Sequence, residues 1–201
     1  MTKHKNIKID KPGIDYIRIL FLSVIALLFL GGCKQVLSYL HPTADFTYVK
    51  RVAIAPFINL TNDKFAGGKV RNVVATEVLR CGVFDVVEFG EVVKVLREEG
   101  MKDDGQISRH IAARAGKRLN IQAIFMGSVL EYGVTRVGGS SVPEVSISMK
   151  LVDTNSYTIL WEATHNRKGT NVLNQLFGVR RWTPEDLCKK VVIEMLGTLF
   201  G

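Results

Sequence analysis

The chain has few of the residues from which catalytic and metal centres are built. Only three of its 201 residues are cysteines, and its four histidines (His4, His41, His110 and His165) lie far apart in the sequence. No HExxH, paired CxxC or GxSxG motif occurs, which removes the usual signatures of zinc proteases, cysteine-rich metal sites and serine hydrolases. We therefore predict no catalytic residue, no metal site, no cofactor and a protein that is not an enzyme.

The sequence also lacks a concentrated basic segment, although its net charge is +8. Residues 1–32 carry five of the 27 basic and two of the 19 acidic residues, so the remaining chain has a net charge of +5. No run of Lys or Arg with interleaved aromatic residues marks a nucleic-acid surface. We expect no nucleic-acid partner, while an anionic partner in the cell envelope remains open.

An apolar run long enough to span a membrane is missing as well. Ile19 to Leu30 is twelve residues long and contains Ser23 as its single polar residue. A helix of this length reaches about 18 Å, short of the ~30 Å hydrocarbon core of a bilayer. The run follows five basic residues, as the apolar region of a secretory signal does. We therefore predict a signal peptide at residues 1–32.

The segment Leu30-Gly31-Gly32-Cys33 resembles the bacterial lipobox, in which an aliphatic residue and two small residues precede a cysteine. The resemblance implies cleavage between Gly32 and Cys33, and acylation of Cys33 by two or three chains such as palmitate. Several chains hold a protein stably on a membrane, since each buried CH₂ contributes about 0.8 kcal/mol. Lys34 follows the cysteine, and by resemblance to the enterobacterial sorting rule this predicts the periplasmic face of the outer membrane. An uncleaved signal anchor is the alternative.

Two cysteines remain beyond the anchor, Cys81 and Cys188. The periplasm permits disulfides, so the two could pair. Each also extends the apolar stripe of a predicted helix, which favours small buried residues without a disulfide. The sequence leaves this choice open.

Residues 33–47 are predicted to be the lipidated cysteine and a short tether, and residues 48–201 a single domain. The fourteen tether residues after Cys33 span at most about 50 Å, which keeps the domain near its membrane. Apolar periodicity, caps and turns predict the order βαβααβββα, an α/β fold with a mixed sheet of about five strands flanked by about four helices. The strands are expected at 48–57, 84–88, 121–129, 145–151 and 157–164, and the helices at 69–80, 91–99, 108–119 and 184–199.

One segment combines apolar, aromatic and basic residues outside the predicted elements. It runs from Lys168 to Trp182 and joins the last strand to the last helix. Arg and Trp are enriched at the centres of protein interfaces, so the segment is a candidate surface for a partner. A loop folded onto its own core is the alternative. The residues of the candidate surface are Leu173, Leu176, Phe177, Arg180, Arg181 and Trp182.

Three motifs in order resemble the CsgG-like family of envelope lipoproteins. They are RVAIAPFINLTNDKFAGGKVRNVVATEVLRCGVFDVVE, then IQAIFMGSVLEYG, then VSISMKLVDTNSYTILWEA, within residues 50–164. This family includes the lipoprotein of the curli-secretion channel and, more distantly, the lipoprotein activators of penicillin-binding proteins. The resemblance implies the CsgG-like fold and a non-enzymatic role.

Each family function demands a further feature. A channel needs membrane hairpins with strands of about 9–11 residues, and neither Gly133–Pro143 nor Lys168–Trp182 suits one. A long-reach activator needs a long linker, which the tether does not supply. The first hypothesis is therefore a non-enzymatic assembly or adaptor factor that binds an envelope protein through its antiparallel strands and the Lys168–Trp182 segment. The alternatives are a homo-oligomeric subunit of a curli-type export complex and an activator of a peptidoglycan synthase.

Overall fold

The computed structural model describes residues 19–21, 23, 36–43, 46–137, 140–169 and 182–200. The chain divides into two units, Met1–Gln35 and Val36–Gly201, and only the second has extensive described structure. In the first unit, residues 19–21 and 23 are helical. No helix within the described ranges is long and apolar enough to cross a membrane.

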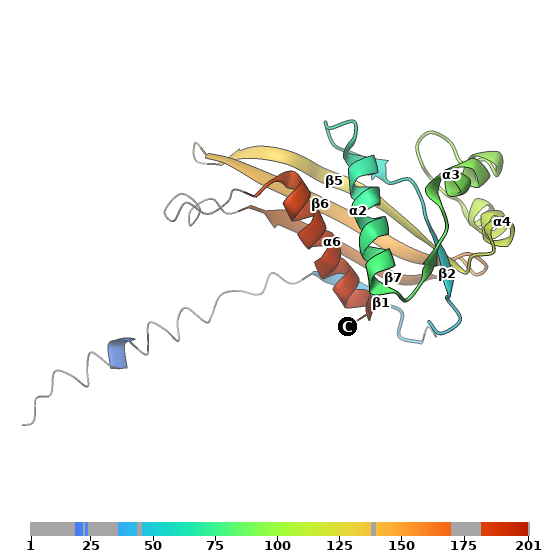
Figure 1. Ribbon diagram of the computed structural model, residues 1–201, viewed down its shortest axis with the longest axis horizontal. Helices are drawn as coiled ribbons and strands as arrows, with labels where there is room; N and C mark the ends of the chain where they lie inside the picture. Colours follow the sequence, from blue (N-terminus) through green and yellow to red (C-terminus); the bar gives the residue numbers. More distant parts are fainter. Residues whose placement is uncertain are drawn as a thin grey trace, which may run out of the picture. The chain divides into compact units, whose positions relative to one another are not determined.

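The second unit is built on a seven-stranded sheet in the order β1-β7-β6-β5-β2-β4, with β3 beside β5 (Figure 1). β2 pairs in parallel with β4 and β5, whereas β5, β6, β7 and β1 pair antiparallel in succession. The predicted mixed α/β sheet is confirmed. The strands are β1 (Leu37–Leu40), β2 (Arg51–Ile54), β3 (Ile58–Asn59), β4 (Asp85–Val86), β5 (Ala123–Val137), β6 (Ser140–Asp153) and β7 (Ile159–Lys168).

The described helices lie where apolar periodicity predicts them, with ends shifted by a few residues. They are α2 (Ala66–Cys81), α3 (Phe89–Glu98), α4 (Arg109–Leu119) and α6 (Pro184–Phe200). Gly82 ends α2 with φ 66°, a left-handed conformation that glycine adopts without strain. Ser108 caps α4 as expected, because its side chain accepts a hydrogen bond from the Ile111 N–H.

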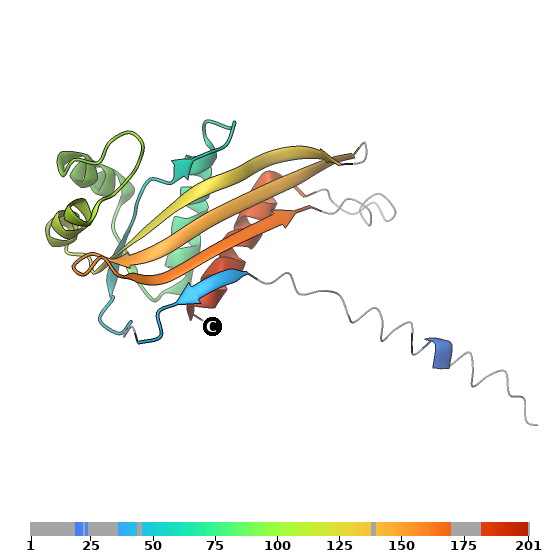
Figure 2. The ribbon, with the colours of Figure 1, turned by 180° about the vertical axis from the view of Figure 1, so that it is seen from behind.

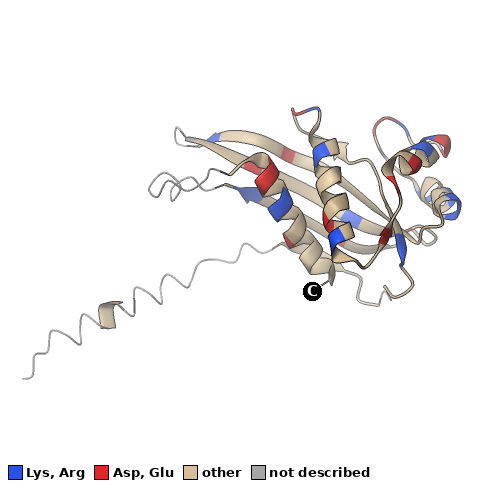
Figure 3. Ribbon diagram, in the orientation of Figure 1, with Lys and Arg blue, Asp and Glu red and all other residues tan. Residues whose placement is uncertain are grey.

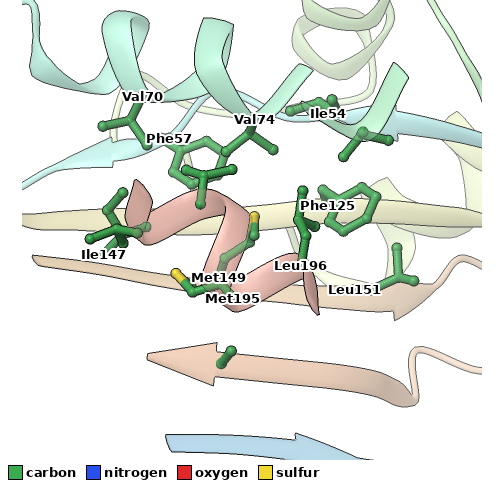
Figure 4. Packing of buried hydrophobic residues seen from close by; sticks show 14 of the residues in the cluster. Ile54, Phe57, Val70, Val74, Phe125, Ile147, Met149, Leu151, Met195 and Leu196 are labelled. Atoms are coloured by element: carbon green, nitrogen blue, oxygen red, sulfur yellow. The ribbon is translucent and has the colours of Figure 1, made fainter. Parts of the chain in front are cut away.

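Helices α2 and α6 cover one face of the sheet (Figure 1). Val70 and Val74 of α2 and Met195 and Leu196 of α6 belong to the same buried cluster as Phe125 of β5 (Figure 4). Complete burial of a side chain such as leucine or phenylalanine contributes about 1.5–3 kcal/mol. This cluster is therefore the main source of the domain's stability.

Helices α3 and α4 cover the opposite face, but only at one end of the long strands. Their apolar residues pack on Ala53 of β2, Ala55 directly after that strand, Ile124 of β5 and Val152 of β6. The remainder of this face has no described helix over it, and Figure 2 shows β5, β6, β7 and β1 in front of α2 and α6. The sheet is therefore covered by helices along one side and only partly on the other.

Several boundaries differ from the sequence-based expectation. β5 and β6 extend through most of Gly133–Pro143, beyond the strand ends expected at residues 129 and 145. Two strands have no counterpart in the predicted order: β3, and β1, which forms inside the expected tether and pairs with β7. The folded unit thus begins at Val36 rather than at Tyr48.

The two cysteines of the domain are both free. Cys188 is buried in α6, as expected, and burial raises the pKa of its thiol to about 12. The prediction of a buried Cys81 was wrong, because Cys81 is the last residue of α2 and is exposed there. An apolar stripe in the sequence does not show where a helix leaves its sheet.

Candidate functional site

The uncovered part of the sheet carries a set of polar side chains in register. Directly opposed residues of neighbouring strands point to the same side of a sheet. One row runs from Tyr39 through Glu162 and Lys150 to Met126, and the next runs from Leu37 through Thr164 and Ser148 to Ser128. We call these eight residues the open face.

A groove of about 330 Å³ lies where the open face meets the segment before α4. Ala55, Pro56 and Ile58 form one wall, and Gly105, Gln106 and Ile107 form another. The floor comes from β5, β6 and β7, with Met126, Ser128, Ser148, Lys150 and Glu162 among its residues. The volume is at the lower end of the range typical of small-molecule pockets.

Tyr157 lines the groove and is bonded to one of its walls. Its hydroxyl donates a hydrogen bond to the carbonyl oxygen of Ile107. Its φ of 61° is unusual for a residue that is not glycine and has to be held by the surrounding structure. The turn before it supplies this support, since the Tyr157 N–H donates to the Asp153 carbonyl at 3.0 Å.

The Asp153 carboxylate organises that turn. It accepts hydrogen bonds from the Asn155 N–H at 2.9 Å, the Ser156 N–H at 2.6 Å and the Tyr48 hydroxyl at 2.7 Å. Burial raises the pKa of Asp153, but the hydrogen bonds outweigh it and hold the pKa below its usual value. Asp153, within the third motif of the family resemblance, thus has a structural role, which is to hold the turn that places Tyr157 beside the groove.

Two opposite charges face the groove without neutralising each other. Lys150 and Glu162 are directly opposed on β6 and β7. Neither makes an ion pair within 4.0 Å in the part of the chain that the structure describes. Lys150 and Glu162 give the groove one positive and one negative group, and Met126 and Ile107 give it apolar contacts for a partner.

Further along the same side of the sheet, the carboxylate of Glu144 binds two polar side chains of β7. It accepts hydrogen bonds from Asn166 at 3.1 Å and pairs with Lys168 at 3.0 Å. Burial raises the pKa of Glu144, yet these partners keep it below its usual value. These charges are satisfied within the sheet, which distinguishes them from Lys150 and Glu162.

Charged residues elsewhere also pair with one another. Arg114 and Arg118 of α4 bind Glu99, and Arg118 also binds Glu98 at 2.5 Å. Figure 3 shows Lys and Arg interleaved with Asp and Glu over these helices. Two of the four Lys and Arg residues of α4 are thus paired with carboxylates at the end of α3.

His165 lies against a carboxylate, an arrangement that could signal a general base. Its Nε2 is 2.8 Å from Oε2 of Glu194, but the same oxygen also accepts a hydrogen bond from Nε of Arg167 at 2.8 Å. The His165 side chain is only 4% exposed, and none of the described cavities is lined by His165 or Glu194. The cluster therefore joins β7 to α6 and does not face a substrate site.

Most residues of the predicted partner surface lie outside the described residues. These are Leu173, Leu176, Phe177, Arg180 and Arg181, and the predicted lipidation site Cys33 also lies outside. Trp182 is described and is 39% exposed, with Nζ of Lys190 5.2 Å from its ring centroid. Sequence reasoning found the alternating strands of the open face, but not Gln106 or Tyr157, which reach the groove only through the tertiary fold.

The fold and the groove together define a class: a single α/β domain with one partly uncovered sheet face. The sequence model of the family described as peptidoglycan-synthase activator LpoB matches residues 39–166, more than half of the 201-residue chain. The chain belongs to this family. Because the family consists of activators, membership confirms that the chain is a non-enzymatic factor of the cell envelope.

Solved structures share the fold at low sequence identity. A PelC dodecamer from Paraburkholderia phytofirmans matches with a TM-score of 0.58 and 19% identity, covering 82% of this chain and 98% of the other. Lipoprotein GNA1162 from Neisseria meningitidis matches with a TM-score of 0.55 and 17% identity, covering 75% and 98%. A comparison with curated proteins gave no significant match.

The family resemblance has two parts, one to the curli-channel lipoprotein and one to the activators of penicillin-binding proteins, and the comparisons support only one of them. They support the distant kinship with the activators of penicillin-binding proteins. They give no support to the nearer resemblance to the curli-channel lipoprotein. The predicted non-enzymatic role is confirmed, and it is the activator branch of the resemblance that carries it.

Proposed function

We propose that this chain is a lipid-anchored activator that binds a peptidoglycan synthase through its groove and the open-face residues of β5, β6 and β7. The family match carries the proposal, because residues 39–166 extend from β1 into β7 and include every residue of the open face except Leu37. Lys150 and Glu162 supply complementary charges for a partner segment, and the apolar groove residues supply burial. Charges of this kind set orientation and specificity at an interface.

The proposed location is the periplasmic face of the outer membrane, with Cys33 as the lipidated residue. The basic residue after Cys33 supports this membrane over the inner one by resemblance to the sorting rule. The finding that β1 begins at Leu37 leaves only three residues between Cys33 and that strand. The synthase region that the domain contacts is therefore expected close to the anchoring membrane.

Charge reversal in the groove tests the binding site. Each single reversal, Lys150→Glu or Glu162→Lys, changes the net charge of the protein. The double variant carries both reversals and keeps the net charge. We expect each single reversal to weaken binding to the penicillin-binding proteins of the same bacterium at least tenfold, the effect of about 1.4 kcal/mol. The measurement is pull-down affinity together with the rate of glycan polymerisation.

Lys94→Glu on α3 is the matched control, because Lys94 is exposed and does not line the groove. It should leave binding and polymerisation unchanged. Groove variants that fold and still stimulate the synthase fully would refute the groove as the binding site. No stimulation by the unaltered protein would refute the activator role itself.

A second candidate is a subunit of a ring-shaped export complex. The observation that favours it is the fold similarity to PelC, which is described as a dodecamer. Light scattering on the protein extracted in detergent tests this candidate. A stable oligomer of many copies supports it, and a strict monomer at all concentrations excludes it.

A further inference from the structure

β1 is the edge strand nearest to the predicted lipid anchor, and its side chains are unusually apolar for their exposure. All four residues of Leu37–Leu40 are exposed. Leu37 is 78% exposed, Tyr39 is 48% exposed and Leu40 is 47% exposed. An exposed group of this kind on a folded domain usually marks a contact surface.

The position of β1 along the chain points to what it contacts. Val36 packs against the main core, and the second unit begins there, three residues after Cys33 in the sequence. The four residues from Cys33 to Leu37, where β1 starts, span at most about 14 Å. If Cys33 carries acyl chains, the start of β1 cannot be farther than this from the lipid headgroups.

The chemistry of the strand matches that layer. Tyr39 has an apolar ring and a polar hydroxyl, and tyrosine is enriched at the interface between lipid and water. Leu37 and Tyr39 alternate to the same side of the strand, since they oppose Thr164 and Glu162 of β7. The Tyr39 ring also meets His41 edge-on, with 6.4 Å between the ring centroids.

The edge position limits how deep the strand can lie. β1 stands at the end of the strand order, so the backbone groups on its outer side have no strand beside them within the described sheet. Such groups cannot enter hydrocarbon without losing hydrogen bonds to water. The headgroup layer supplies water for the backbone groups and apolar contact for the side chains. We therefore expect β1 to lie at the depth of this layer.

From these observations we infer that β1 is a membrane-contact strand: Leu37 and Tyr39 rest in the headgroup layer of the anchoring membrane. The inference rests on the lipid anchor of the proposed function. It adds that the folded domain itself touches the lipid, with the β1 edge of the sheet facing the membrane. The open face then stands beside the membrane surface.

The experiment uses the full lipidated protein in vesicles of phosphatidylethanolamine and phosphatidylglycerol. Cys81→Ser removes the exposed thiol of the domain, and the buried Cys188 is left in place. A fluorophore sensitive to its environment is attached to Leu37→Cys or Tyr39→Cys, and lipids brominated near the headgroup are the quencher. We expect quenching several-fold stronger at both positions than at the control position.

The control is the same fluorophore on Phe65→Cys. Phe65 is 62% exposed and precedes α2, whose start is distant from β1 in both views (Figures 1 and 2). Its exposure is similar to that of Leu37 and Tyr39, but it does not lie on β1.

The possible outcomes distinguish failure of the membrane contact from failure of the lipid anchor or of synthase activation. Vesicle-bound protein with equally weak quenching at all three positions overturns the membrane contact and leaves the anchor intact. Disulfide-linked dimers of the unlabelled Tyr39→Cys variant, together with no lipid quenching of the labelled variant, would show a second copy at β1 and also overturn it. Protein that fails to stay on vesicles overturns the anchor, whereas synthase stimulation is measured separately and can survive either result.

Discussion

At the scale of single residues, Glu194 shows how a residue that resembles a catalytic partner is used for structure. Its carboxylate binds Arg167 through both oxygens and His165 through one, and so links β7 to α6. Burial raises the pKa of Glu194, but the hydrogen bonds from Arg167 and His165 outweigh it and hold the pKa below the usual 4.5. The charged form is therefore the one that the fold stabilises.

This linkage predicts a pH dependence of stability. A carboxyl with a depressed pKa in the folded state stabilises the fold above its unfolded pKa, and this stabilisation is lost as the pH falls through the folded pKa. Glu194→Gln removes the charge but keeps a polar group. We expect the variant to lose about 1–3 kcal/mol of unfolding free energy near neutral pH, and this difference should shrink below about pH 4.5. Urea unfolding at several pH values measures it.

The matched control is Glu91→Gln, since Glu91 lies exposed in the first turn of α3. Its unfolding free energy should stay within about 0.5 kcal/mol of the unaltered protein. A Glu194→Gln variant whose deficit is the same at every pH would contradict the assignment of the charge.

At the scale of elements, the close approach of α4 to the turn between β6 and β7 positions the groove. A Cβ on Gly116 of α4 would lie 2.6 Å from Oγ1 of Thr154 and 2.7 Å from its Cβ. Thr154 is 1% exposed, and its hydroxyl donates to the Ile121 carbonyl at 3.0 Å, so it has little freedom to move. Glycine at position 116 is therefore required by packing rather than by backbone conformation.

Gly116→Ala should consequently destabilise the domain. Alanine favours a helix by about 1 kcal/mol over glycine, but overpacking costs about 1–3 kcal/mol, and backbone shifts between α4 and the turn add to it. We expect a net loss of about 1–2 kcal/mol in chemical unfolding. Gly197→Ala on α6 is the control, because a Cβ there meets nothing within 4 Å. Equal stability of the two variants would show that the contact is not tight.

The elements also show what a sequence can and cannot reveal. The helices of the domain were predictable because their apolar stripes and caps, such as Ser108, are local signals. β1 and β3 were missed because four and two residues carry too little periodicity, and their pairing with β7 and β5 is a long-range event. For the same reason Lys150 and Glu162 could be assigned to exposed faces, but the wall from Gln106 and Ile107 could not be predicted.

At the scale of the whole molecule, the predicted anchor decides where the domain acts. Cys33→Ser should prevent acylation, so we expect the protein to move from the membrane fraction to the soluble periplasmic fraction. Immunoblots of separated fractions measure this. A variant that remains in the membrane fraction with residues 1–32 uncut would instead indicate a signal anchor.

The three-residue spacing between Cys33 and Val36 also affects how a partner is found. With acyl chains on Cys33, a domain on so short a connection would not explore the depth of the periplasm and would diffuse in two dimensions with its height nearly constant. Encounters with a partner in the same layer then occur at a raised effective concentration, and part of the orientational entropy of binding is lost before the partner arrives. An affinity measured with the domain free in solution should therefore understate how often the two proteins are bound at the membrane.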